Sequence, residues 1–236
     1  MKPENRHDIP HDAAIAFFDL DETITDADTD SLWAAWRSRR ELKGWAERAW
    51  LFRLYRDFRK GRMDIEEYIR YHRFRIGPLA VDEFRDKGRS FFNDAGRRSI
   101  YREAEEIIVQ CKRMRCRVAL LTAQNDCIAG PFAEYLGMDA MIANRFKNDG
   151  RRFTEPVKPY SFAEGKVALG REYAASKGVP LAQCAFFGDS IYDSPFLELV
   201  GFPVAVNPDR MLEARALEKR WRILRFSRLN THDGNF

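Results

Sequence analysis

Short apolar runs separated by helical segments constrain the fold of this chain more than any other feature of its sequence. The runs predict strands at Ala13–Phe18, Cys116–Thr122, Met138–Asn144, Cys184–Asp189 and Phe202–Val206. A continuous apolar run of this length is typical of a parallel strand that is covered on both faces. Because helical segments separate most of these runs, the sequence predicts an α/β fold with a doubly wound, Rossmann-like parallel sheet.

One long interruption follows the first strand. From Ser31 to about Cys116 the sequence shows only helical periodicity, with aromatic residues three and four positions apart and glycines at the ends of segments. We therefore expect a catalytic core of residues 1–27 and 115–236, and an inserted all-helical cap domain of residues 28–114.

A few residues predict local boundaries. Asp30 and Ser31 are expected to cap the first helix of the inserted block. Pro131, which follows a glycine, is expected to break or restart a helix. Asp149 and Gly150 lie between two alternating segments and predict a hairpin turn.

The composition limits the class of protein. With 236 residues, 45% of them hydrophobic, the chain is long enough for one large domain or a core with an inserted module. Its polar first residues do not resemble a signal peptide, and no run approaches the roughly 18 apolar residues of a membrane span. The four cysteines form no CxxC pair, which argues against a zinc site or a disulfide framework. We therefore predict a cytoplasmic protein with reduced thiols.

The net charge of +4 conceals an uneven distribution. The first thirty residues are strongly acidic, whereas residues 31–117 carry a large excess of lysine and arginine. A basic helical block is usually a solvated face, but it could also attract an anionic substrate, a nucleic acid or a lipid surface. We expect a small-molecule substrate and no nucleic-acid partner.

Polar residues follow several of the predicted strands, which is where ligands bind in doubly wound sheets. Asp19 and Asp21 end the first strand, and Thr122 ends the second. Asp189 follows a later strand, and Lys166 lies in the helix that precedes that strand. These segments are far apart in the sequence, yet the topology predicts that they meet in one crevice.

The carboxylates after the first strand suggest a specific chemistry. Asp19 could attack a phosphorus atom as a nucleophile and form an aspartyl-phosphate. Asp21 could protonate the leaving oxygen and then deprotonate the water that hydrolyses this intermediate. Carboxylates in a group repel one another unless a cation lies among them, and oxygen-only ligands suit Mg²⁺. The Lys166 ammonium and the Thr122 hydroxyl could hold the phosphate oxygens.

Each of these residues also has an ordinary structural interpretation. An aspartate at the end of a strand is often a turn former, and Lys166 alone would be a solvated helix residue. Thr122 could cap the next helix, and Asp193 could cap the helix that contains Pro195. His72 is expected on a helix face rather than as a base. Packing rather than a ligand cage is expected for the aromatic residues of the cap, which are Trp33, Trp36, Trp45, Trp50, Phe52 and Tyr55.

Four motifs, in order along the chain, resemble those of the haloacid dehalogenase superfamily of phosphatases. They are DLDET at 19–23, LLTA at 120–123, EGKVALG at 164–170 and GDSIYD at 188–193. An ordered set of this kind is far more specific than any one of its members. The resemblance covers nearly the whole chain and implies phosphomonoester hydrolysis with Mg²⁺.

The resemblance assigns roles to individual residues. It implies that Asp19 is the nucleophile and a metal ligand, and that Asp21 is the acid and base whose backbone carbonyl also binds Mg²⁺. Asp189 would bind the metal, and Asp193 would support it or orient Lys166. The phosphate ligands that it implies are Thr122, Ala123 and Lys166.

The helical insertion resembles the cap of subfamily IB, which includes phosphoserine and histidinol phosphatases. In phosphoserine phosphatases an acidic residue nine positions after the nucleophile contacts the substrate amino group, and here that position is Asp28. An arginine of the cap would then be available for a substrate carboxylate. Two features depart from the subgroup: Glu22 stands where glycine or serine is frequent, and TAQN at 122–125 replaces a run of small residues.

The sequence therefore predicts a Mg²⁺-dependent phosphoric monoester hydrolase for a small, amine-bearing metabolite of the phosphoserine or histidinol phosphate type. One alternative is a phosphatase of lipid or other phosphomonoesters. Another is a receiver-like signalling module, although receivers lack a cap inserted after the phosphorylated aspartate. A third is a non-catalytic binding protein whose basic cap docks on an acidic surface.

Overall fold

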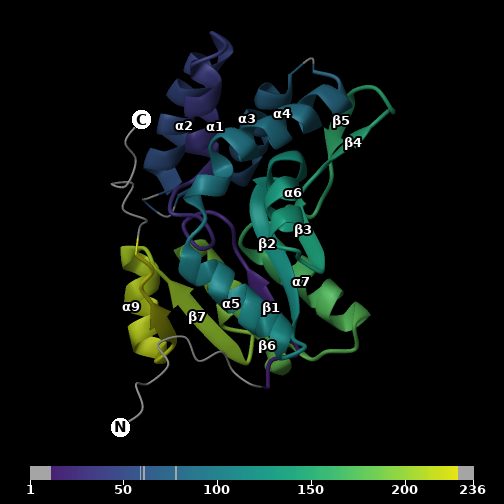
Figure 1. Cartoon of the computed structure of the whole chain (residues 1–236). Helices are drawn as coiled ribbons and strands as arrows, with labels where there is room; N and C mark the ends of the chain where they lie inside the picture. Colours follow the sequence, from purple (N-terminus) through teal and green to yellow (C-terminus); the bar gives the residue numbers. More distant parts are fainter. Residues whose placement is uncertain (1–11, 59, 61, 78, 228–236) are drawn as a thin grey trace, which may run out of the picture.

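The computed structural model describes residues 12–58, 60, 62–77 and 79–227 (Figure 1). The ends of the predicted core, residues 1–11 and 228–236, lie outside the described residues. Within these ranges a sheet with helices on both faces forms the lower part of the molecule, and a layer of helices lies above one edge of that sheet (Figure 1).

The sheet has six strands in the order β3-β2-β1-β6-β7-β8, and every neighbouring pair is parallel. This order confirms the doubly wound α/β fold, and β2 continues past Thr122, where the sequence predicted its end. The strands are β1 Ile15–Phe18, β2 Arg117–Asn125, β3 Ala140–Asn144, β6 Cys184–Gly188, β7 Phe202–Val206 and β8 Arg222–Leu224.

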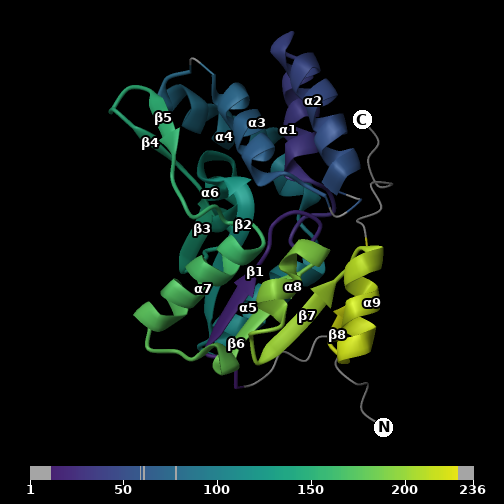
Figure 2. The same ribbon diagram turned by 180° about the vertical axis from the view of Figure 1, so that it is seen from behind.

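Alternate residues of β1 belong to two separate hydrophobic cores. Ala16 and Phe18 pack in the core that α5 and α6 cover, whereas Ile15 and Phe17 pack in the core that α7, α8 and α9 cover. Figure 1 shows the face with α5, and Figure 2 shows the face with α7 and α8. These helices are α5 Arg102–Arg113, α6 Asp126–Tyr135, α7 Glu164–Ser176, α8 Ser194–Leu197 and α9 Arg210–Lys219, with short 3₁₀ turns η1 Gly96–Ser99, η2 Leu181–Gln183 and η3 Ile191–Asp193.

The chain between β1 and β2 is helical where it is described, as predicted. The helices that form the upper layer in Figure 1 are α1 Thr29–Ser38, α2 Lys43–Phe58, α3 Ile65–Ile76 and α4 Val81–Asp94. In contrast, Ile107 and Ile108 of α5 are buried with Val118 and Leu120 of β2. The cap limits of 28–114 remain a prediction, and this packing favours placing α5 in the core. None of the helices in the described ranges is both long and apolar enough to cross a bilayer.

A hairpin links the sheet to the cap. Its strands, β4 Phe146–Asn148 and β5 Phe153–Pro156, are antiparallel and flank the predicted turn at Asp149 and Gly150. The hairpin reaches α4, because Ala80 and Arg152 form a β-bridge and the rings of Phe84 and Phe153 meet edge to face at 5.9 Å. The hairpin is therefore a second connection between the core and the cap.

The predicted break at Pro131 is wrong, because α6 runs through this residue. Pro131 has no N–H to donate to the carbonyl oxygen of Cys127, one turn earlier. That oxygen instead lies against Gly88 of α4, where an added Cβ atom would come within 2.2 Å of it. The close packing of α4 against α6 holds the proline-containing segment in a helix.

Candidate active site

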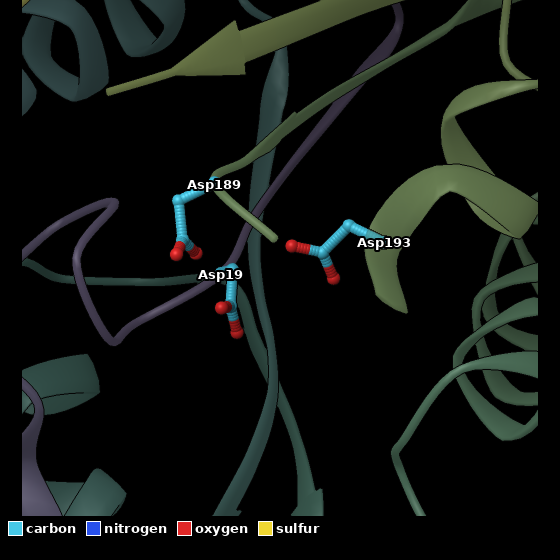
Figure 3. Close-up of side chains that lie close together, drawn as sticks. All are labelled: Asp19, Asp189 and Asp193. Carbon is cyan, nitrogen blue, oxygen red and sulfur yellow. The ribbon is translucent and has the colours of Figure 1, made fainter. Parts of the chain in front are cut away.

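The polar residues that the sequence predicted at the strand ends meet at the carboxyl edge of the sheet. Figure 3 shows Asp19 after β1, Asp189 after the neighbouring strand β6, and Asp193 at the end of η3. One oxygen of each of these buried carboxylates lies within 4.8 Å of the others. A backbone hydrogen bond of 2.9 Å from Asp19 N to Phe187 O fixes the first of them to β6.

The buried Lys166 ammonium lies between two of these carboxylates. Its Nζ is 2.9 Å from Asp19 Oδ1 and 2.7 Å from Asp193 Oδ1. Burial alone would lower the pKa of Lys166, but Asp19 and Asp193 outweigh it and raise this pKa, so the side chain is a cation. Asp193 lies at the N-cap position of α8, but its side chain makes no capping bond there and pairs with Lys166 instead.

The acidic cluster Asp19, Asp189 and Asp193 fits a divalent cation. Burial, reinforced by the other two carboxylates, raises the pKa of Asp189 well above its ordinary value. Burial raises the pKa of Asp193 to about 6, against the opposing effect of Lys166. These raised pKa values reflect burial and mutual repulsion that disfavour the charged carboxylates, and a bound cation would relieve both; the ligand atoms of the cluster are all oxygens. Carboxylate oxygens are the ligands that Mg²⁺ prefers.

Asp21 lies beside the cluster in the same cavity and has a separate partner. Its Oδ1 accepts a hydrogen bond of 2.6 Å from Thr29 N, at the start of α1. Burial, followed by repulsion from Asp28, Asp30 and Asp19, raises the pKa of Asp21 well above its ordinary value. A raised pKa favours the protonated form, which is the form that a general acid needs.

The second predicted motif lies within β2. Thr122 is fully buried, and its Oγ1 accepts a hydrogen bond of 3.0 Å from Gln124 N. Its interpretation as a cap of the next helix is wrong, because Asn125 caps α6 by accepting a hydrogen bond from Cys127 N. Ala123 lines the cavity that also contains Asp19 and Lys166. The roles of Thr122 and Ala123 as phosphate ligands remain predictions.

A cavity of about 80 Å³ lies between this edge of the sheet and the cap. Besides Asp21 and the acidic cluster, acidic side chains and aromatic rings line it, and Lys166 is the one basic residue among its lining residues in the described part of the chain. Among the described residues no arginine of the cap lines the cavity, and the contact of a cap arginine with a substrate carboxylate remains a prediction. Arg75 of the cap is buried and forms an ion pair with Asp30. The further acidic and aromatic lining side chains are Glu22, Asp28, Asp30, Tyr55, Phe58, Tyr68, Phe162 and Tyr192, and Leu51, Leu54, Met63, Ala163 and Ser190 also line the cavity.

Asp28 has a place in both the helix and the cavity. It is the N-cap of α1, where its Oδ2 accepts a hydrogen bond of 2.5 Å from Ser31 N. The predicted caps, Asp30 and Ser31, are therefore wrong by a few residues. Asp28 also lines the cavity, and burial together with Asp30 raises its pKa to about 7. Contact of Asp28 with a substrate amine remains a prediction.

The aromatic residues of the cap divide into three groups. Trp33 and Trp36 pack in the core, as expected, whereas Trp45 and Phe52 are 59% and 76% exposed, so their predicted packing is wrong. Trp50 and Tyr55 are partly buried and pack against a smaller core in the cap, as expected, and Tyr55 also lines the cavity. His72 lies on the buried face of α3, and neither of its nitrogens has a hydrogen-bond partner in the described ranges.

Sequence reasoning missed several residues that organise the site. Thr23 donates a hydrogen bond of 3.2 Å from Oγ1 to Asp189 Oδ1, and its place in the DLDET motif could have indicated this. The Tyr192 hydroxyl accepts a hydrogen bond of 2.7 Å from Met63 N and so joins η3 to the cap. Gln124 connects β2 to the cap, and the only sequence feature that included it was the departure TAQN at 122–125.

Comparisons with known proteins agree with this geometry. Residues 16–198 match the family model of haloacid dehalogenase-like hydrolases. The chain is similar to a histidinol-phosphatase of Neisseria meningitidis serogroup C, at 30% identity over 219 residues that cover 90% of this chain and 98% of that protein. Among solved structures it is similar to a protein of unknown function from Bordetella pertussis Tohama I, with a TM-score of 0.77, 27% identity and coverage of 90% and 98%. A substrate-bound phosphoserine phosphatase shares the fold, with a TM-score of 0.66, 18% identity and coverage of 90% and 92%.

Proposed function

This chain belongs to the haloacid dehalogenase-like hydrolases and is a phosphatase, and we propose that it hydrolyses a small, amine-bearing phosphomonoester through an aspartyl-phosphate on Asp19, with Mg²⁺ bound. The observation that carries this proposal is the buried cluster of Asp19, Asp189 and Asp193 with Lys166 between two of its carboxylates. A buried carboxylate can attack a phosphate ester as a nucleophile. A bound cation and the lysine ammonium would neutralise the negative charge of the phosphate during this attack.

The proposed reaction has two steps. In the first, an Asp19 oxygen forms a bond to phosphorus while the bond from phosphorus to the leaving oxygen breaks, and Asp21 transfers its proton to that oxygen. In the second, Asp21 takes a proton from water, the resulting hydroxide attacks phosphorus, and the bond to Asp19 breaks. Inorganic phosphate leaves, Asp19 is again a carboxylate and Asp21 is again protonated. Lys166 stabilises the charge on the phosphoryl oxygens throughout.

Mg²⁺ is the proposed cofactor. The side chains of Asp19 and Asp189, with the backbone carbonyl of Asp21, would hold it, and Asp193 would orient Lys166 at 2.7 Å. A bound Mg²⁺ would supply positive charge next to the phosphate and lower the repulsion between Asp19 and the ester.

The lining of the cavity supports an amine-bearing substrate. Asp28 and Glu22 add negative charge near the catalytic aspartates, which disfavours a second anionic group and favours an ammonium. Since Lys166 already pairs with Asp19 and Asp193, the described lining offers no free cation for a substrate carboxylate. Within the predicted substrate types, this favours an amino-alcohol phosphate such as histidinol phosphate over phosphoserine.

A comparison of substrates and metals tests this proposal. We expect kcat/KM to be highest for histidinol phosphate, lower for phosphoserine, and lower for an uncharged aryl phosphate. Excess chelator should abolish turnover, and added Mg²⁺ should restore it. Full activity in chelator would remove Mg²⁺ from the mechanism, and a preference for amine-free sugar phosphates would refute the substrate class while leaving the phosphatase in place.

The other possibilities have less support. The cap inserted after Asp19 is unlike the receiver arrangement, and the complete set of Asp19, Lys166 and Asp189 disfavours a non-catalytic binding protein. Lipid and other phosphomonoesters remain alternatives that the substrate comparison would reveal. A cytoplasmic location and the lack of a nucleic-acid partner remain predictions.

A further inference from the structure

Gln124 occupies an unusual position between the catalytic core and the cap. It lies two residues after Thr122 in β2, and its side chain is fully buried. In the sequence, Gln124 is notable only because it belongs to TAQN at 122–125, which replaces the small residues expected after the second motif. Its contacts join three parts of the molecule that the proposed reaction uses.

The amide of Gln124 has a hydrogen-bond partner for every group that it offers. Nε2 donates to Thr29 Oγ1 at 2.8 Å and to Asp30 Oδ1 at 2.7 Å. Oε1 accepts from Arg75 Nη1 at 3.1 Å and from Asn125 N at 2.8 Å. Because both partners of Oε1 are obligate donors, a flipped amide would place donor against donor. The side chain is therefore held in one orientation.

These contacts reach the catalytic groups on two sides. On one side, the backbone N–H of Gln124 donates to the Thr122 hydroxyl at 3.0 Å. On the other side, Thr29 accepts from Gln124 through Oγ1 and donates its own N–H to Asp21 Oδ1 at 2.6 Å. Two hydrogen bonds through Thr29 therefore connect Gln124 to Asp21, the proposed general acid.

The same amide binds a buried ion pair of the cap. Asp30 and Arg75 are 2% and 0% exposed, and they pair with each other. Tyr68 donates a hydrogen bond of 2.7 Å to Asp30, and Arg75 Nη2 donates a hydrogen bond of 2.7 Å to the Tyr71 hydroxyl. Breaking a buried network of hydrogen bonds around an ion pair is costly, so Gln124 has a single well-defined partner surface on the cap.

We propose that Gln124 is a positioning residue that couples the seating of the cap to the alignment of the proposed general acid, Asp21. When the Asp30–Arg75 pair binds Gln124, the hydrogen bond from Gln124 holds Thr29 in place, and the Thr29 N–H orients Asp21 toward the leaving oxygen. The backbone N–H of Gln124 holds the Thr122 hydroxyl at the same time. Without Gln124, the cap keeps its own ion pair but loses its fixed attachment to β2. This inference rests on the proposed function.

The dependence on the leaving group tests the proposal. We compare kcat/KM for 2-aminoethyl phosphate, whose alkoxide needs a proton to leave, with kcat/KM for 4-nitrophenyl phosphate, whose phenolate does not. In Gln124→Met, which keeps the length of the side chain but not its hydrogen bonds, the alkyl ester should lose at least about tenfold more than the aryl ester. A well-placed general acid contributes roughly a hundred- to ten-thousandfold, so a selective loss of this size is measurable.

Two further variants keep the test decisive. Thr29→Val removes the hydroxyl that accepts from Gln124 Nε2 but keeps the backbone N–H and the shape of the side chain. We expect the same selective loss on the alkyl ester, but a smaller one. This variant decides the question if Gln124→Met does not fold. Gln183→Met, at an exposed glutamine, is the matched control and should leave both esters unchanged.

The outcomes separate this inference from the function on which it rests. Equal losses on both esters in folded Gln124→Met and Thr29→Val, or no loss at all, would overturn the positioning role. A wild-type protein that hydrolyses neither ester would instead refute the proposed function.

Discussion

Asp28 illustrates how one side chain carries a structural and an electrostatic role that substitution can separate. It caps α1 through Ser31 N and also lines the cavity. Asn caps helices as well as Asp does, so Asp28→Asn should keep the melting temperature and remove only the charge. We expect kcat/KM for an amine-bearing ester to fall about ten- to a hundredfold, with an uncharged aryl ester spared.

Asp28→Ala is the companion variant, because it removes both the charge and the cap. It should show the same selective loss together with a lower melting temperature. If Asp28→Asn slows both esters to the same extent, Asp28 has no part in recognising the amine.

His72 makes the stability of the cap depend on pH. Burial, followed by the charge of Arg75 and opposed by Asp30, lowers its pKa from 6.5 to about 3. Between these values the unfolded chain binds a proton that the folded chain refuses, so the free energy of unfolding should decrease as the pH falls below about 6.5. The decrease from this site is about 2 kcal/mol by pH 5.

Urea unfolding of wild-type protein and His72→Phe at pH 7.5 and pH 5 measures this contribution. Phe keeps a planar ring that binds no proton, so the variant should lose about 2 kcal/mol less than wild-type protein between the two values. Identical pH dependence in the two proteins would show that His72 is not held in its neutral form.

At the residue scale, the sequence located the groups that end strands and missed those that act across elements. Asp19 and Asp189 could be found because each follows an apolar strand, and Lys166 could be found only from its place in the ordered set of motifs. Gln124 could not, because its partners Thr29 and Arg75 come from two cap helices whose position over β2 is a property of the tertiary packing.

Helices α4 and α6 provide the clearest test at the scale of elements. An added Cβ at Gly88 would come within 2.2 Å of Cys127 O, whereas at Gly130, on the same pair of helices, it would meet nothing within 4 Å. Gly88→Ala should therefore force the helices apart and destabilise the protein by about 1–3 kcal/mol. In Gly130→Ala the gain in helix propensity, about 0.5–1 kcal/mol, is opposed by the restriction that Pro131 places on the residue before it, so we expect a stability near that of the wild-type protein.

Thermal or urea unfolding of the two variants measures both effects. The prediction fails if Gly88→Ala is as stable as Gly130→Ala. The same contact explains why local sequence signals at Pro131 were misleading: a proline predicts a break in an isolated helix, but packing against Gly88 decides the conformation here.

At the scale of the molecule, the parallel sheet and the helical insertion could be predicted because hydrophobic periodicity reports burial directly. The division between cap and core could be predicted only in part. Both α4 and α5 have amphipathic sequences, and nothing local indicates that α5 packs on the sheet while α4 packs on α6 and the hairpin. The contact surface of each helix depends on the others.

The cap and the core enclose the site together, so the chemistry is the most direct test of the whole arrangement. If the proposed mechanism is correct, Asp19 becomes covalently phosphorylated during turnover. Wild-type protein is mixed with substrate and Mg²⁺, quenched in acid within the first turnovers, and digested, and the phosphorylated peptide is located by mass spectrometry. We predict one phosphoryl group on the peptide that contains Asp19, and none in Asp19→Asn, which should also lose activity by more than about a hundredfold. Turnover without an acid-stable phosphoryl group on this peptide, or substantial activity of Asp19→Asn, would contradict the account.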